Sequence, residues 1–136
     1  SQKIPVTGAI VVTTPQDIAL IDARKAVDMF GKVNIPIFGV LENMSVHICS
    51  HCGHHEPIFG QDGGKALAER LGVPLLGQLP LSLPVREAMD CGSAAQMQAA
   101  HPAIAQIYTE AAWQTALAVA AKGKDFSNRF PQIVVE

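Results

Sequence analysis

The chain has 136 residues, a formal net charge of −2, and a composition in which 49% of the residues are hydrophobic and 16% are charged. This length suits one domain with a hydrophobic core, and no basic patch predicts binding of nucleic acid. The chain has three cysteines, no visible signal peptide and no apolar run of about 20 residues. We therefore expect a cytoplasmic protein rather than a disulfide-rich secreted protein or a membrane protein.

Two strands separated by a helix are predicted in the first third of the chain. Residues 8–13 form a β-branched run without polar alternation, which is typical of a strand buried on both faces of a parallel sheet. Thr14 suits the N-cap of the following helix and Pro15 its first position, and Gly31 suits its end. Residues 35–41 predict a second buried strand.

The remaining sequence predicts five further elements and an unassigned tail. They are a small returning strand at 57–59, a helix at 62–71, a third main strand at 74–79, a short helix at 84–89 and a long helix from 102 to about 122. The tail, residues 123–136, has no assigned element, because its apolar residues 133–135 suit either a strand or disorder.

This order predicts an α/β fold, with one domain over residues 1–136 in which three main parallel strands are flanked by helices. Polar or unusual residues follow each strand, at 14–17, 42–44 and 80–81. The carboxyl ends of parallel strands meet at one edge of a sheet, and ligands bind there. We therefore expect these three segments to lie together at a ligand-binding edge.

Cys49 and Cys52 are separated by two residues, and this spacing allows two thiols to bind one metal ion. Gly53 follows directly and permits the left-handed turn that directs backbone N–H groups toward the sulfur atoms. The sequence therefore predicts metal binding by Cys49 and Cys52. A thioredoxin-type redox dithiol is an alternative, but that motif opens a helix, whereas a glycine and two histidines follow this one.

Two sources of the remaining ligands are open, because thiolate metal centres usually have four. A histidine could complete a zinc site within one chain, although the spacing from the cysteines is unusually short. A second CxxC from a symmetry-related chain could instead complete one shared centre. This arrangement supplies four thiolate ligands without any histidine and is the simpler of the two. The nearby histidines then become solvated residues of the loop. They are His51, His54 and His55.

Three other features receive structural interpretations. Residues 59–66 resemble a phosphate loop, but Phe59 replaces the required glycine and Ala66 the required hydroxyl residue, so we predict only a helix start. Cys91 is interpreted as a small buried apolar residue. Trp113 is interpreted as a packing residue of the last helix.

The sequence resembles the Mrp/ApbC family of iron–sulfur cluster carrier ATPases, in the MinD-like branch of the P-loop NTPases. The resemblance spans about residues 4–92 and is carried by three stretches. They are TGAIVVTTPQDIALIDARKAVDMF, VLENMSVHICSHCGHHEPIFG and VPLLGQLPL. The most specific motifs are TTPQD, ENMS and CxxCG.

The resemblance implies a function for four residues. Cys49 and Cys52 match the cysteines with which two subunits of a homodimer hold one bridging [4Fe–4S] cluster that is passed to apoproteins. Asn43 matches the position that contacts adenine, and Pro80 matches the loop on the other side of the base. A further match, at residues 16–17, lies in a motif near the dimer face. The intact family protein also binds ATP and Mg²⁺.

The family's phosphate loop and aspartate-rich switch segment precede the TTPQD strand, and this chain begins just before that strand. We therefore expect the C-terminal half of a P-loop NTPase, without catalytic residues and without ATP hydrolysis on its own. An open sheet edge would make it associate or lower its stability. The alternative function is a zinc-stabilised interaction domain. A membrane-bound ATPase is disfavoured, because helix 102–122 carries little positive charge.

Overall fold

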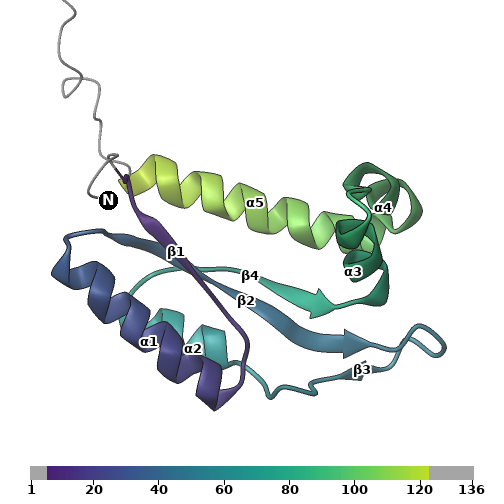
Figure 1. Ribbon diagram of the computed structural model, residues 1–136, viewed down its shortest axis with the longest axis horizontal. Coiled ribbons are helices and arrows are strands. Elements are labelled where there is room, and N and C mark those ends of the chain that lie inside the picture. Colours follow the sequence, from purple (N-terminus) through teal and green to yellow (C-terminus); the bar gives the residue numbers. More distant parts are fainter. Residues whose placement is uncertain (1–5, 123–136) are drawn as a thin grey trace, which may run out of the picture.

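The computed structural model describes residues 6–122, which form an α/β arrangement of four strands and five helices (Figure 1). The strands are β1 (Ala9–Thr13), β2 (Ile37–Ile48), β3 (His55–Glu56) and β4 (Leu75–Leu81). The helices are α1 (Asp17–Lys32), α2 (Gly63–Leu71), α3 (Leu83–Asp90), α4 (Ala94–Ala100) and α5 (Pro102–Lys122). The tail and the predicted strand at 133–135 lie outside the described residues.

The sheet has β2 at its centre, parallel to β1 on one side and to β4 on the other. The prediction of three main parallel strands is therefore confirmed. The short β3 runs antiparallel to the end of β2 and makes the sheet mixed. The returning strand was predicted at 57–59, but it forms at His55–Glu56, where the chain lies opposite the end of β2.

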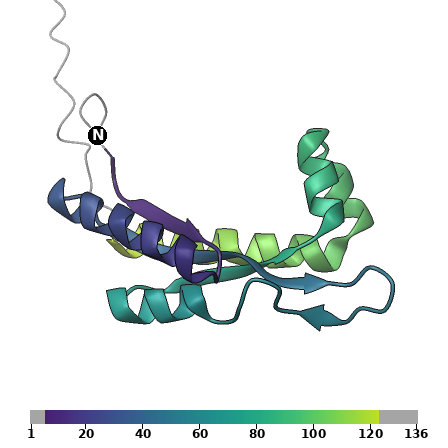
Figure 2. The same ribbon diagram turned by 60° about the horizontal axis from the view of Figure 1, so that its bottom comes forward.

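Helices cover both faces of the sheet. The helices α1 and α2 pack on one face, and α5 packs on the other, mainly over β4 (Figure 2). One apolar core fills the space under α1 and α2, formed by Val11, Leu20, Ala23, Val40, Leu67 and Ala68. On the other face Gly77 lets α5 approach β4 closely, since a Cβ built there would lie 2.8 Å from Cβ of Ala111.

The helices differ from the prediction most at the start of α1, which begins at Asp17 rather than at Pro15, and at α4. Residue Thr14 does not cap α1, because Gln16 occupies the N-cap and no side chain bonds to the first turn. The Thr14 hydroxyl is instead buried without a hydrogen-bond partner among residues 6–122. Helix α4 was not predicted. Its N-cap residue, Ser93, is a common helix start, but the alanine-rich run 94–100 is short and buries only Met97.

The central strand is much longer than predicted. Residues 42–44, expected to end the strand, lie within β2, which continues to Ile48 because β3 and the end of β4 pair with it. Strand β4 likewise extends to Leu81, so Pro80 lies within a strand rather than in a loop. Only residues 14–17 follow a strand end as expected.

Two side chains predicted to be inside are exposed. Cys91 is exposed at the C-cap of α3, where the chain turns towards α4. Trp113, on α5, is 63% exposed. Across residues 6–122, none of the helices has both the length and the apolar character needed to cross a membrane.

Candidate metal centre at the tip of the β2–β3 hairpin

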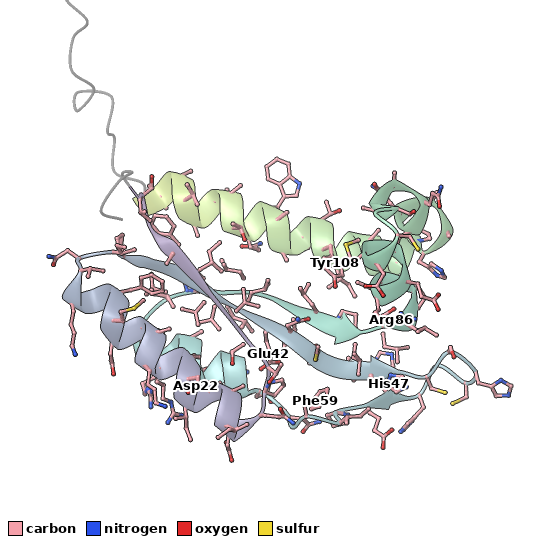
Figure 3. All side chains as sticks on the ribbon, viewed as in Figure 1. Asp22, Glu42, His47, Phe59, Arg86 and Tyr108 are labelled. Carbon is pink, nitrogen blue, oxygen red and sulfur yellow. The ribbon has the colours of Figure 1, made fainter. Side chains whose placement is uncertain are left out.

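The cysteine pair lies in the loop of a hairpin that projects from one end of the sheet (Figure 1). The two strands pair at His47 with Glu56 and at Ile48 with His55. A tight loop of six residues, 49–54, joins them. His47 marks the base of this hairpin in Figure 3.

Backbone hydrogen bonds fold the loop around Cys49. The Cys49 amide donates to the His54 carbonyl (2.9 Å), and the Gly53 amide donates to the Cys49 carbonyl (2.9 Å). Gly53 has a φ of +70°, the left-handed conformation that its position after Cys52 predicted. The loop is thus closed on itself and holds the two cysteines on one short turn.

The thiols of this turn are free and accessible. Cys49 is partly exposed and Cys52 is exposed. The backbone N–H of Cys52, followed by that of His51 and then by the Cys52 thiol, lowers the pKa of Cys49. A nearby carboxylate, Glu56, opposes this effect. At a given pH, Cys49 therefore has a larger fraction of thiolate, the form that binds soft metals, than a cysteine without these hydrogen bonds.

Neither a zinc site nor any other site of three ligands forms within residues 6–122. No group of three or more histidine, cysteine, aspartate or glutamate side chains converges on one point there. His51, His54 and His55 are exposed, and they do not gather around the thiols. Within the described residues, one copy of this hairpin therefore offers two thiols as candidate metal ligands.

The lowered pKa of Cys49 predicts thiol reactivity at a lower pH than in the unfolded chain. A Cys52→Ala/Cys91→Ser variant leaves Cys49 as the only thiol and keeps the backbone N–H at position 52. Alkylation by iodoacetamide requires the thiolate, so its rate should rise at lower pH in native protein than in the same variant in urea. If the alkylation rate depended on pH in the same way in native protein and in urea, the folded loop would not be the cause of the lowered pKa of Cys49.

Asn43 and Pro80 occupy neighbouring strands near the hairpin. Asn43 pairs with Leu79, so Pro80 is one residue beyond its partner on β4. Asn43 is half-buried and lines a hollow of about 540 Å³ together with residues of β1 and α1. Pro80 is buried and does not line this hollow. Residues 16–17 are exposed at the start of α1.

The structural role of Glu42 was not predicted, because residues 42–44 were placed only at the expected ligand-binding edge. Glu42 is fully buried beside Asn43, and Figure 3 shows it between the strands and α2. One carboxylate oxygen accepts from the Gly64 amide at the start of α2 (2.6 Å), and the other accepts from Gln78 Nε2 (2.7 Å). A lone acidic residue that ends an apolar strand run was the only signal in the sequence. Glu42 fixes β2, β4 and α2 next to the hairpin.

Two solved structures share this fold. A nucleotide-binding protein in complex with ADP from Archaeoglobus fulgidus aligns at a TM-score of 0.56 and 26% identity, over 64% of this chain and 36% of that chain. The cell division ATPase MinD of Pyrococcus furiosus aligns at a TM-score of 0.58 and 22% identity, over 82% of this chain and 43% of that chain. The chain therefore shares the α/β fold of part of each of these two proteins.

The family follows from the sequence. The profile of the ParA family described as NUBPL iron-transfer P-loop NTPase matches residues 1–116, and the chain belongs to this family. It is 63% identical over 93 residues to the iron–sulfur cluster carrier protein of Escherichia coli K12, covering 68% of this chain and 25% of that protein. The iron–sulfur cluster transfer protein NUBPL of Mus musculus is 53% identical over 92 residues, which cover 68% of this chain and 29% of that protein.

A third relative extends further along the chain. The iron–sulfur cluster carrier protein of Pseudomonas fragi is 54% identical over 112 residues, covering 82% of this chain and 39% of that protein. The predicted resemblance to iron–sulfur cluster carriers is confirmed by these matches. The chain spans only 25% to 39% of the length of these three relatives.

Proposed function

We propose that this chain carries the cysteine pair with which a homodimeric carrier binds an iron–sulfur cluster and passes it to apoproteins. The observation that carries the proposal is the turn at Cys49 and Cys52, which presents two accessible thiols at the tip of a projecting hairpin. Relatives named as cluster carriers and cluster transfer proteins support this function. The cluster is cargo in this proposal, because it must leave as well as bind.

The proposed cluster is a [4Fe–4S] cluster shared by two chains. Such a cluster is usually held by four thiolates, and each chain offers two at this tip. A two-fold axis through the cluster would bring equivalent hairpins together without further ligands. Two exposed pairs make a labile centre that a recipient apoprotein can approach. Thiols that must remain reduced also suit the cytoplasm, to which we assign the protein.

A nucleotide role is proposed for the neighbouring residues. The family is described as P-loop NTPases, and one structural relative is a complex with ADP. We assign the base of ATP, bound with Mg²⁺ in the intact protein, to Asn43 and Pro80. The Asn43 amide can donate and accept hydrogen bonds at a purine edge, and Pro80 offers an apolar surface on the adjacent strand.

Replacing Cys49 or Cys52 by alanine is expected to abolish cluster binding, because each chain then offers one thiolate and the shared centre only two. Anaerobic reconstitution with iron and sulfide, followed by visible absorption and iron analysis, measures this loss. Cys91→Ala is the matched control, because that thiol lies on α3 and outside the hairpin. Cluster binding that persists in both the Cys49→Ala and the Cys52→Ala variants would contradict the proposal.

Metal analysis separates this function from a zinc-stabilised interaction domain. The zinc alternative is not supported by the relatives, which are named for iron–sulfur clusters. It requires one tightly held zinc in each chain and unfolding when zinc is chelated. The carrier function instead predicts that reduced, metal-free protein keeps its fold, since the hairpin loop is closed by backbone hydrogen bonds.

A further inference from the structure

Helix α5 is apolar on more than the side that packs on the sheet. Its only charged residues are Glu110 and Lys122. The side that faces the sheet includes the buried Ala111, which lies against Gly77 of β4. Trp113 comes two residues later, which is about 200° further around an α-helix. Trp113 therefore projects from the side of α5 opposite to the sheet.

This opposite side carries a continuous apolar surface. Trp113 is 63% exposed and Leu117 is 57% exposed, and Ala116 and Ala120 are exposed beside them. Residues three, four and seven positions apart share one face of a helix, so these four side chains lie together and form what we call the outer face of α5. A helix that is apolar on all sides is normally covered on all sides. Residues 6–122 leave the outer face exposed, so we looked for a group that covers it.

The tail, residues 123–136, is the nearest apolar sequence. It follows α5 directly, begins with a glycine and contains Phe126 and Phe130. A glycine after the last residue of a helix commonly lets the chain reverse its direction. Trp113 lies nine residues before the end of α5, which is about 14 Å back along the helix axis. Residues 123–130 span up to about 26 Å when extended, so both phenylalanines can reach the outer face.

Charge and attachment both favour the tail over a second copy of the chain. Glu110 lies three residues before Trp113, on the same side of α5. It is exposed, it accepts a hydrogen bond from Gln114 Nε2 (2.8 Å), and it forms no ion pair within residues 6–122. Arg129 directly precedes Phe130, so a tail that brings Phe130 to Trp113 also brings a cation to this carboxylate. Attachment to α5 gives the tail an effective concentration on the order of millimolar, which a second copy lacks.

We propose that residues 124–131 fold back along the outer face of α5 and cover Trp113 and Leu117 with Phe126 and Phe130. The contact is separate from the proposed cluster binding, because it lies on α5 and not on the β2–β3 hairpin. It shields an apolar surface that would otherwise favour association of the chain. Trp113 is then a packing residue whose partner is the tail.

Tryptophan fluorescence tests this contact, because Trp113 is the only tryptophan of the chain. In the reduced, metal-free chain of 136 residues, Phe126→Ser/Phe130→Ser should move the emission maximum to longer wavelength, because the indole loses its apolar cover. Trp113 is 63% exposed without the tail, and covering half of that area should make acrylamide quenching about twofold weaker in the wild type than in the double variant. Equal emission and equal quenching in the two proteins would overturn the proposal.

Ser127→Ala/Asn128→Ala is the matched control, because it changes two polar residues of the same segment and should leave the fluorescence as in the wild type. An equal change in the control would show that the phenylalanines are not the cover. Far-UV circular dichroism of each variant separates a loss of cover from unfolding. Cover by the tail of the same chain does not depend on protein concentration. A wild-type emission maximum that moves to that of the phenylalanine variant on dilution would assign the cover to a second copy and contradict the proposal.

NMR spectroscopy of the wild type gives a second test that needs no variant. Nuclear Overhauser effects are expected between the indole protons of Trp113 and the ring protons of Phe126 or Phe130, since packed aromatic rings lie about 5–7 Å apart. Indole protons that show such effects only to residues of α5 would overturn the proposal. None of these measurements uses iron, so failure of the cluster proposal would be seen separately in the reconstitution of the wild type.

Discussion

Replacing Glu42 by alanine is expected to lower the free energy of unfolding by about 3 kcal/mol. The carboxylate is fully buried, and it accepts hydrogen bonds from the Gly64 amide and from Gln78 Nε2. Alanine would leave both donors without this partner and would open a cavity between β2, β4 and α2. Urea unfolding of the reduced protein, followed by circular dichroism, measures the change.

Two matched variants identify the cause of that loss. Glu42→Gln keeps the size of the side chain and an oxygen that can accept from the Gly64 amide, so its loss should be smaller, about 1 kcal/mol. Glu69→Ala removes an exposed glutamate from α2 and should change the free energy of unfolding by less than about 0.5 kcal/mol. A Glu42→Ala loss as small as that of Glu69→Ala would contradict a structural role for the buried carboxylate.

Gly63→Ala is expected to destabilise the protein by about 2 kcal/mol, because α2 starts against the turn between β1 and α1. A Cβ at position 63 would lie 2.5 Å from the Pro15 carbonyl oxygen and 2.9 Å from Leu20 Cδ1. The carbonyl belongs to the backbone and cannot rotate away, so α2 or the turn must move. The same unfolding experiment measures the loss.

Gly31→Ala is the control for this prediction. Gly31 lies in the last turn of α1, and a Cβ built there meets no atom within 4 Å. Alanine favours a helix over glycine, so this substitution should raise the free energy of unfolding by up to about 1 kcal/mol. Opposite signs for the two variants would assign the effect of Gly63→Ala to the close approach of α2. If both variants changed the free energy of unfolding by the same amount and in the same direction, the close approach of α2 would not be the cause.

The buried parallel strands were predictable because their sequences leave few alternatives. The β-branched run at β1 and the apolar run at β4 predict strands, and both form within two residues of the predicted bounds. Burial on both faces is not complete, because Val12 of β1 is 58% exposed. The length of β2 was not predictable in this way. Its second half, residues 43–48, is half-buried and alternates polar with apolar residues, so it does not continue the apolar run, and its pairing depends on the hairpin.

The candidate site was predictable only where local sequence carries the chemistry. Spacing and the following glycine identified Cys49 and Cys52, whose turn is closed by bonds within the loop. Glu42 could not be interpreted from sequence, because its two partners lie 22 and 36 residues away. The exposure of Cys91 was likewise missed, since it depends on how the chain turns between two short helices.

Native mass spectrometry of the anaerobically reconstituted chain tests the central proposal most directly. We expect a dimer whose mass includes one [4Fe–4S] cluster, and we expect it to dissociate when the cluster is removed, because the shared centre supplies the link between hairpins. Mixing with Cys49→Ala/Cys52→Ala protein should give no cluster-bearing mixed dimer. A monomer that retains a metal ion, or a cluster held by one chain, would contradict the proposal.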